Sequence, residues 1–159
     1  MRGTRRSAAS TWRCRAVIIR PGIAADLPII QAWLADAGLP IVDLTPDHMN
    51  DFLVAVVDTE SAGMIGLEQF DKLGLLRSLV IDPAARRSGI GRQLVAALEA
   101  KAVDRGVAEL WLLTIDAEAY FLKLGYEVKE RDRAPGVIRE TDEFSSLCPG
   151  DAVVMRKGL

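Results

Sequence analysis

Apolar residues follow two periods along this chain, and each period predicts one kind of element. Short apolar runs between turn residues predict β-strands. These runs lie at residues 16–21, 52–58, 62–70, 73–81, 108–115, 126–131 and 152–157. Apolar residues that recur every three to four positions predict helices. These segments lie at residues 24–39, with Gly38 as the stop, at 90–106 and at 116–125, with Asp116 as the N-cap. Residues 39–51, with or without one turn of helix, and residues 132–150 are expected to be loops.

The order of these elements predicts the fold class. Three consecutive strands between residues 52 and 81 are joined by short turns, which favours an antiparallel meander. The helix at 90–106 then connects two strands as a crossover, which favours a parallel pair. We therefore expect a single α/β domain, residues 16–159, with a mixed antiparallel and parallel sheet of about seven strands flanked by helices.

Residues 1–15 differ from the rest, because they hold five arginines and no acidic residue. Such a segment is typical of a disordered extension or of an upstream start codon, and Arg-rich, acid-poor starts also occur in transit peptides. We exclude this segment from the fold prediction.

Charge and cysteine content exclude several classes of function. The 20 basic and 22 acidic side chains leave a net charge of −2, whereas a nucleic-acid-binding domain is normally basic. No apolar run reaches the roughly 20 residues of a membrane span. The two cysteines, Cys14 and Cys148, form no CxxC pair, which argues against a disulfide scaffold or a zinc site and fits a reducing cytoplasm. We expect a cytoplasmic protein without a metal, a nucleic acid or a membrane as partner.

The stretch RRSGIG, residues 86–91, joins a predicted strand to a predicted helix. Glycines at a helix N-terminus let an anion approach N–H groups that lack intrahelical partners, and nearby arginines add charge. A tight turn that needs glycine for its dihedral angles alone is the alternative. The third glycine of a dinucleotide-binding GxGxxG loop is missing here, and so is the GK[ST] of a Walker loop.

The remaining pattern, Arg-x-x-Gly-x-Gly, resembles the pyrophosphate-binding motif of the GNAT superfamily of acyl-CoA-dependent N-acyltransferases, and residues 79–106 look like that family's strand-loop-helix core. The resemblance implies that the fourth and fifth strands splay apart to admit acetyl-CoA as co-substrate. Pantetheine would pair with the fourth strand, and a backbone N–H would polarise the acetyl carbonyl. The implied cofactor-binding residues are Leu79, Val80, Ile81, Arg86, Arg87, Ser88, Gly89, Ile90, Gly91 and Arg92.

Acetyl transfer to an amine needs two proton transfers, and the sequence offers few groups for them. Many relatives carry a tyrosine acid at the position that Phe121 occupies here, and Tyr120, about 100° away around the helix, is expected to pack or to face elsewhere. The general acid is therefore unassigned. His48, the only histidine, is expected to be a solvated loop residue.

Three residues are candidates for catalytic roles. Glu68 interrupts an apolar strand and is the candidate base or a carboxylate that positions a water, or else it points to solvent. Strand alternation places Arg77 and Leu79 on one face and Ser78 on the other, so one of Arg77 and Ser78 is expected to line the acceptor pocket. Thr114 either faces the thioester or is buried and bonded to backbone.

A narrower resemblance rests on LLRSLVI (75–81), LLTIDAEAYFLKLGY (112–126) and RETDEFSSLCPGDAVVMRK (139–157). These segments look like the GNAT branch associated with arsenic resistance, and they imply acetylation of a small amine such as an amino-acid-like arsenical. The positions that carry the resemblance are Glu68, Arg77, Ser78, Thr114, Phe144, Ser145, Cys148 and Pro149, of which Arg77, Phe144 and Cys148 are the expected substrate contacts.

The arsenical, if it is the substrate, is expected to be bound through its amine, carboxylate or oxyanion. Trivalent arsenic prefers several thiolates, and Cys148 has only Cys14 as a potential second thiol. Arg77, Arg133 and Arg139 are candidate clamps for the carboxylate or oxyanion, with surface charge as the alternative for the last two.

Together these features predict an N-acetyltransferase that joins acetyl-CoA and a small-molecule amine in one ternary complex, because no serine or cysteine lies in a recognisable triad. A protein or peptide acetyltransferase and a non-catalytic acyl-CoA sensor are the alternatives, and Phe121 motivates the second. The resemblance also implies a homodimer formed through the last strands.

Overall fold

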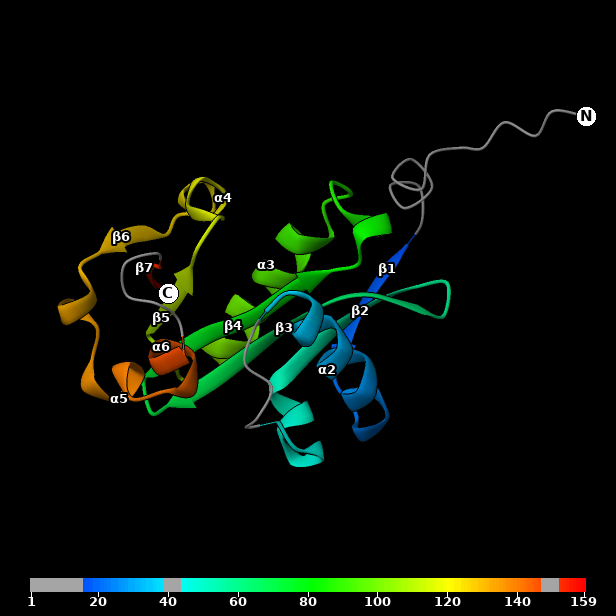
Figure 1. Cartoon of the computed structure of the whole chain (residues 1–159), viewed down its shortest axis with the longest axis horizontal. Helices are drawn as coiled ribbons and strands as arrows, with labels where there is room; N and C mark the ends of the chain where they lie inside the picture. The colour runs from blue at the N-terminus through cyan, green and yellow to red at the C-terminus, as the bar shows by residue number, and fades with distance from the viewer. Residues whose placement is uncertain (1–15, 39–43, 147–151) are drawn as a thin grey trace, which may run out of the picture.

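The computed structural model describes residues 16–38, 44–146 and 152–159, and these residues form one seven-stranded sheet with helices on both faces (Figure 1). The strand order is β1-β2-β3-β4-β5-β7-β6. Neighbouring strands are antiparallel except for β4 and β5, which are parallel. The strands are β1 (Val17–Pro21), β2 (Phe52–Val57), β3 (Glu60–Phe70), β4 (Leu73–Ile81), β5 (Glu109–Thr114), β6 (Glu127–Lys129) and β7 (Val153–Gly158). The predicted mixed sheet is confirmed.

A two-residue turn joins β2 and β3. Asp58 and Thr59 have φ angles of 49° and 73°, and type I′ hairpin turns require positive φ at both central residues. The twist of such a turn matches that of the flanking strands, so the backbone here joins β2 and β3 into the meander that the apolar runs predict.

The helices are α2 (Leu27–Asp36), α3 (Ile90–Asp104), α4 (Glu118–Lys123), α5 (Gly136–Arg139) and α6 (Asp142–Ser146). Short 3₁₀ turns precede or separate them at Ala24–Asp26, Pro46–Asp51, Pro83–Ala85 and Arg131–Arg133. The expectation that residues 132–150 form a loop is wrong for α5 and α6, which are too short to show a helical period. The N-cap of α4 is Ala117, not Asp116.

Alternating strand residues divide the core between the two faces of the sheet. In β2, Leu53 and Ala55 pack under α3, whereas Phe52 and Val54 pack under α2. In β5, the residue pair Leu110 and Leu112 faces α3, while its neighbours Trp111 and Leu113 face α5 and α6. The period of two in these strands therefore determines both layers of the core.

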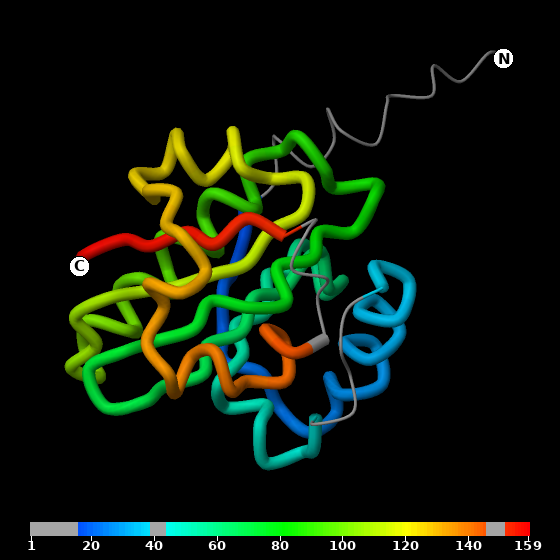
Figure 2. Tube along the Cα trace, turned by 60° about the vertical axis from the view of Figure 1, so that its left-hand side comes forward, coloured from blue at the N-terminus to red at the C-terminus, as the bar shows by residue number. Residues whose placement is uncertain are grey.

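Strands β4 and β5 separate shortly after they meet. They pair only from Leu73 with Glu109 to Leu75 with Trp111, although β4 continues to Ile81. Figure 2 shows the last strand, coloured red, returning into the sheet, where it pairs with β5 on one side and β6 on the other. The predicted splay of the fourth and fifth strands is confirmed, and it leaves a gap that the helices do not fill.

Within the described ranges, no helix has the length and apolar character needed to cross a membrane.

Candidate active site

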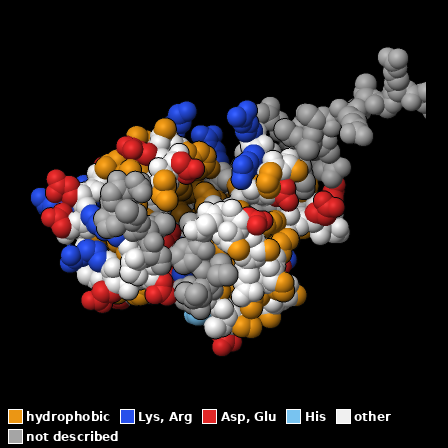
Figure 3. Space-filling model, viewed as in Figure 1, with side chains coloured by type: hydrophobic (Ala, Val, Ile, Leu, Met, Phe, Trp, Pro, Cys, Tyr) orange, Lys and Arg blue, Asp and Glu red, His pale blue; other side chains and the backbone are white. Residues whose placement is uncertain are grey.

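A cavity of about 820 Å³ occupies the gap between β4 and β5. Its walls come from the end of β4, the glycine loop, the start of α3, the end of β5, and α4. Figure 3 shows the molecule hollowed on one face, with hydrophobic side chains inside the hollow and Lys and Arg side chains at its upper rim. The basic side chains that line the cavity are Arg77, Arg86, Arg87, Arg92 and Lys123.

A β-bulge interrupts β4 in the cavity wall. Gly66 of β3 pairs with Arg77 and Met64 pairs with Val80, so β4 holds one extra residue at this point. Ser78 takes a φ of 60°, which is uncommon for a residue other than glycine. A bulge disrupts the hydrogen-bond ladder and re-aims neighbouring side chains. The expected simple alternation is therefore wrong here, because Arg77, Ser78 and Leu79 all line the same cavity.

The glycine loop ends at the N-terminus of α3. Arg87 and Gly89 have φ angles of 63° and 85°, and backbone turns of this kind gather N–H groups into an anion-binding concavity. Gly89 is the N-cap of α3 and offers no side chain to the first N–H groups of the helix. The Ser88 hydroxyl donates a hydrogen bond to the Ala85 carbonyl and fastens the loop. A pyrophosphate fits these donors and the arginines around them.

Tyr120 covers this loop from α4. A Cβ atom on Gly91 would come within 2.8 Å of the Tyr120 hydroxyl oxygen, so glycine allows this approach. Burial raises the pKa of the Tyr120 hydroxyl, and the positive charge of Arg92 lowers it by less. The side chain therefore stays protonated at neutral pH. The expectation that Tyr120 faces elsewhere is wrong, since both it and Phe121 line the cavity. The Phe121 ring itself is buried in the core.

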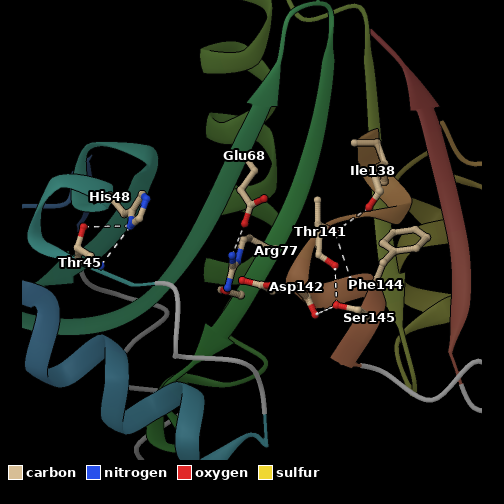
Figure 4. Close-up of polar contacts among 10 residues, drawn as sticks. Thr45, His48, Glu68, Arg77, Ile138, Thr141, Asp142, Phe144 and Ser145 are labelled. Carbon is tan, nitrogen blue, oxygen red and sulfur yellow. Dashed lines mark hydrogen bonds and ion pairs between the residues drawn. The ribbon is translucent and has the colours of Figure 1, made fainter. Parts of the chain in front are cut away.

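Arg77 belongs to two cavities. It lines the large cavity and also a second one, of about 260 Å³, which includes Glu68 and His48. Its side chain is 3% exposed, and it forms an ion pair with Glu68, as Figure 4 shows. Its Nε also donates to the Ser78 hydroxyl at 3.2 Å. Glu68 thus lines the second cavity, where its carboxylate is paired with the guanidinium of Arg77. Its role as the base stays a prediction.

His48 lies at the second cavity and is exposed, as expected for a loop histidine. Its Nδ1 accepts a hydrogen bond of 3.2 Å from the Thr45 backbone N–H (Figure 4).

Thr114 ends β5 and lines the large cavity. It is buried, and its hydroxyl oxygen accepts a bond of 3.0 Å from the Ala117 backbone N–H. The backbone-bonded alternative therefore describes its contact. The bond uses the oxygen as acceptor, and a hydroxyl keeps its proton as a donor.

The described residues after β6 that were predicted to contact the substrate line neither of the two cavities. Phe144 is buried in the core beneath α6, with the Arg131 guanidinium 5.2 Å from its ring centre, and it lines neither cavity described above. Arg133 and Arg139 are exposed and line neither cavity. Ser145 donates to the Thr141 carbonyl within α6. Cys148, Pro149, Cys14 and the predicted extension at 1–15 lie outside the described residues.

Glu143 is the residue that sequence reasoning missed. It is a buried acid on α6, and it lines the large cavity with Arg77, Ser78 and Thr114. The signal available in the sequence was its position next to Phe144, because a large aromatic residue usually packs into the core and brings its neighbours in the chain close to it. Within the part of the chain that the structure describes, no three His, Cys, Asp or Glu side chains gather as a metal-binding group.

Comparison with known proteins assigns the class. The model of the acetyltransferase (GNAT) family matches residues 24–126. An uncharacterized N-acetyltransferase from Chlorobaculum tepidum is 33% identical over 115 residues, which are 71% of this chain and 74% of that protein. The chain therefore belongs to the acetyltransferase (GNAT) family, a family of N-acetyltransferases that use acyl-CoA donors.

More distant relatives share the fold. An amino-acid acetyltransferase from Neisseria meningitidis is 25% identical over 132 residues, which are 78% of this chain and 30% of that protein. N-acetylglutamate synthase from Neisseria gonorrhoeae, solved with coenzyme A and N-acetyl-glutamate, matches with a TM-score of 0.80 at 24% identity over 91% of this chain. A Mycobacterium tuberculosis protein solved with coenzyme A matches with a TM-score of 0.73 at 22% identity over 89% of this chain. The chain spans about a third of the two Neisseria proteins (30% and 35%).

Proposed function

We propose that this enzyme transfers the acetyl group of acetyl-CoA to the primary amine of a small, carboxylate-bearing molecule, by direct attack in a ternary complex. The observation that carries this proposal is the single cavity that runs from the glycine loop to the bulge of β4, with Arg77 at the bulge. Such a cavity can hold a phosphorylated donor at one end and an amine acceptor at the other.

The glycine loop binds the pyrophosphate in this proposal. Backbone N–H groups from Gly89 onward and the side chains of Arg86, Arg87 and Arg92 face a dianionic group, and charge-assisted hydrogen bonds of this kind are short and strong. The edge of β4 at Leu79, Val80 and Ile81 has lost its parallel partner, and its polar backbone groups are available to pantetheine.

The bulge supplies the electrophilic assistance. At Ser78 the ladder between β3 and β4 is broken, and a backbone N–H there can donate to the acetyl oxygen as negative charge develops on it. Removing one such donor in other enzymes costs about a hundredfold or more in kcat. Thr114 lies across the cavity and keeps a hydroxyl proton for the thioester region.

Arg77 recognises the acceptor's carboxylate in this proposal. Its guanidinium is buried, is held by Glu68 and Ser78, and lies where the two cavities meet. Forked donors match a carboxylate or a related oxyanion. The relatives that act on amino acids support this substrate class. An amino-acid-like arsenical is one member of the class, as the resemblance of residues 139–157 suggests.

Thiol release from acetyl-CoA tests the proposal. The purified chain is assayed with amino acids, amino-acid-like arsenicals and phosphinates, polyamines and a short peptide. Release with amino acids or their analogues is the expected result. Release with peptides alone would identify a peptide acetyltransferase. Coenzyme A binding without release from any amine would identify a sensor, the alternative that Phe121 favours because a phenylalanine cannot donate a proton.

A further inference from the structure

Glu143 places a carboxylate in the wall of the acetyl-CoA cavity. The residue is 4% exposed, whereas Asp116, the other acid that lines this cavity, is exposed. Burying a carboxylate costs free energy unless hydrogen bonds or charges compensate. An acid kept in the wall of a substrate cavity is therefore a candidate for a role in binding or proton transfer.

The fold fixes where this carboxylate lies. The Thr141 hydroxyl donates to the Ile138 carbonyl at 2.7 Å and ties the start of α6 to the end of α5 (Figure 4). The next residue after Glu143, Phe144, is 1% exposed in the core, and its carbonyl accepts a hydrogen bond from Arg131. Phe144 therefore anchors the backbone of α6 against the core and fixes the side of the helix from which Glu143 projects.

The reaction needs a proton acceptor on this side of the cavity. An amino acid carries its amine as an ammonium at neutral pH, and an ammonium has no lone pair with which to attack. Glu68 lies in the second cavity, where Arg77 binds its carboxylate. The side chains of the large cavity that titrate or carry charge are Arg77, Arg86, Arg87, Arg92, Asp116, Tyr120, Lys123 and Glu143. Of these, Glu143 is the buried acid, and it lines the same cavity as the bulge residues Arg77 and Ser78.

We propose that Glu143 receives the ammonium group of the acceptor and accepts its proton; this inference rests on the proposed function. The proton passes from the ammonium nitrogen to a carboxylate oxygen of Glu143, which leaves a neutral amine. The amine nitrogen forms a bond to the acetyl carbon, and the carbon–sulfur bond breaks with its electron pair leaving on sulfur. The second N–H proton goes to that sulfur, so the products are the N-acetylated acceptor and coenzyme A thiol.

The carboxylate already interacts within the chain. A carboxylate has about four acceptor positions, so an ammonium adds to these interactions or replaces one of them. In this proposal Arg77 binds the carboxylate of the acceptor and Glu143 binds its ammonium, so the cavity selects a zwitterion. This pair of charges deepens the proposed substrate class from small amines to α-amino acids and their close analogues.

Glu143→Gln tests the inference, with Glu140→Gln as the matched control. Glu140 is three residues earlier, is exposed, and lines neither cavity. We expect kcat/KM for the best amino acid to fall about 100-fold at pH 7 in Glu143→Gln, since proton transfer by a positioned base is worth about 10²- to 10⁴-fold. We expect the loss to shrink as the pH approaches the pKa of the acceptor's own ammonium. The affinity for coenzyme A and the unfolding midpoint are measured alongside, and both are expected to stay near wild type.

The outcomes separate the two claims. A wild-type enzyme without turnover on any amino acid or analogue would overturn the proposed function and this inference with it. A wild type that turns over while Glu143→Gln keeps the same kcat/KM and pH profile would overturn the inference alone. If Glu143→Gln does not fold, Glu143→Ala removes the carboxylate, and added formate can replace it as proton acceptor; wild-type kcat/KM in Glu143→Ala without formate would also contradict the proposal.

Discussion

At the scale of single residues, Arg77 is a charged side chain in a buried position, and its charge needs compensating partners. Its guanidinium is buried at the junction of two cavities, where it is held by Glu68 of the neighbouring strand β3 and by Ser78, the next residue on its own strand β4. A buried cation needs such partners, because removing one leaves charge without compensation. Glu68 therefore supports the position of Arg77 whether or not it also transfers a proton.

Glu68→Gln is expected to lower the free energy of unfolding by about 1–2 kcal/mol, less than for a fully buried pair because Glu68 is 28% exposed. Urea unfolding measures this change, with Glu60→Gln, an exposed change on the same strand, as control. In the enzyme assay, we expect a raised KM for the acceptor, because Glu68 positions Arg77; a collapse of kcat would instead identify Glu68 as the base. Equal stability of the two variants would contradict the support of Arg77 by Glu68.

At the scale of elements, the ends of strands and helices determine the site. Gly89 begins α3 with a φ of 85°, and Gly106 follows the same helix with a φ of 83°. Neither glycine has an atom within 4 Å of the position of an added Cβ. The two positions carry the same backbone strain, but only Gly89 lines the cavity.

Gly89→Ala and Gly106→Ala are expected to cost about 1–2 kcal/mol of stability each, the price of a left-handed conformation for an ordinary residue. Only Gly89→Ala is expected to weaken coenzyme A binding, by about tenfold or more, because its Cβ meets the pyrophosphate; this factor corresponds to about 1.4 kcal/mol. Calorimetric titration with coenzyme A checks this. Equal affinities for the two variants would exclude the loop from the pyrophosphate site.

The end of β1 is attached to the turn that precedes α2 by an ion pair. Arg20 donates to both oxygens of Asp26, at 2.7 and 2.9 Å, and the Ile23 N–H donates at 2.8 Å. These hydrogen bonds hold the pKa of Asp26 below its usual value despite burial, and the bond from Arg20 has the largest effect. Stability from this carboxylate is therefore complete above a pH of about 4 and is lost as the pH falls through the lower folded value.

Asp26→Asn is expected to be less stable than wild type by about 1–3 kcal/mol at pH 7, because it removes a charge-assisted pair. The difference should narrow as the pH falls below about 4, where wild type also loses the charge. Urea unfolding across this pH range measures the effect, and Asp36→Asn, an exposed change on α2, is the control. A difference that does not change with pH would contradict the assigned ion pair.

The elements also explain how far the sequence predicts this molecule. Apolar runs and helical periods predicted most of the strands, α2 and α3, since these elements are long enough to show a period, whereas the splay of β4 and β5 was predicted only from the resemblance of the glycine loop to the GNAT motif. The bulge at Ser78 was missed because Arg77 and Ser78 read as ordinary alternation, and only the register against β3 reveals the extra residue. The helices α5 and α6 have four and five residues, too few for a period, and Glu143 was missed with them.

At the scale of the whole molecule, the sheet combines a donor site and an acceptor site. β4 and β5 are neighbours in the sheet but pair only at Leu73–Leu75 with Glu109–Trp111, and the cavity lies where they have separated. The glycine loop and the bulge lie on the same side of the gap, because α3 and β4 are joined by the loop itself. The donor is therefore fixed by local sequence, whereas the acceptor depends on residues from β3, β4 and α6 that only the fold brings together.

The central claim is that this cavity joins acetyl-CoA to a primary amine that also carries a carboxylate. The most direct measurement compares kcat/KM for the best amino acid of the panel with kcat/KM for the same compound lacking its carboxylate. We predict a fall of about 100-fold or more without the carboxylate, since a hydrogen-bonded charged pair is worth about 1.5–3 kcal/mol or more when buried. Equal rates for the two compounds, or turnover only with the decarboxylated amine, would contradict the account.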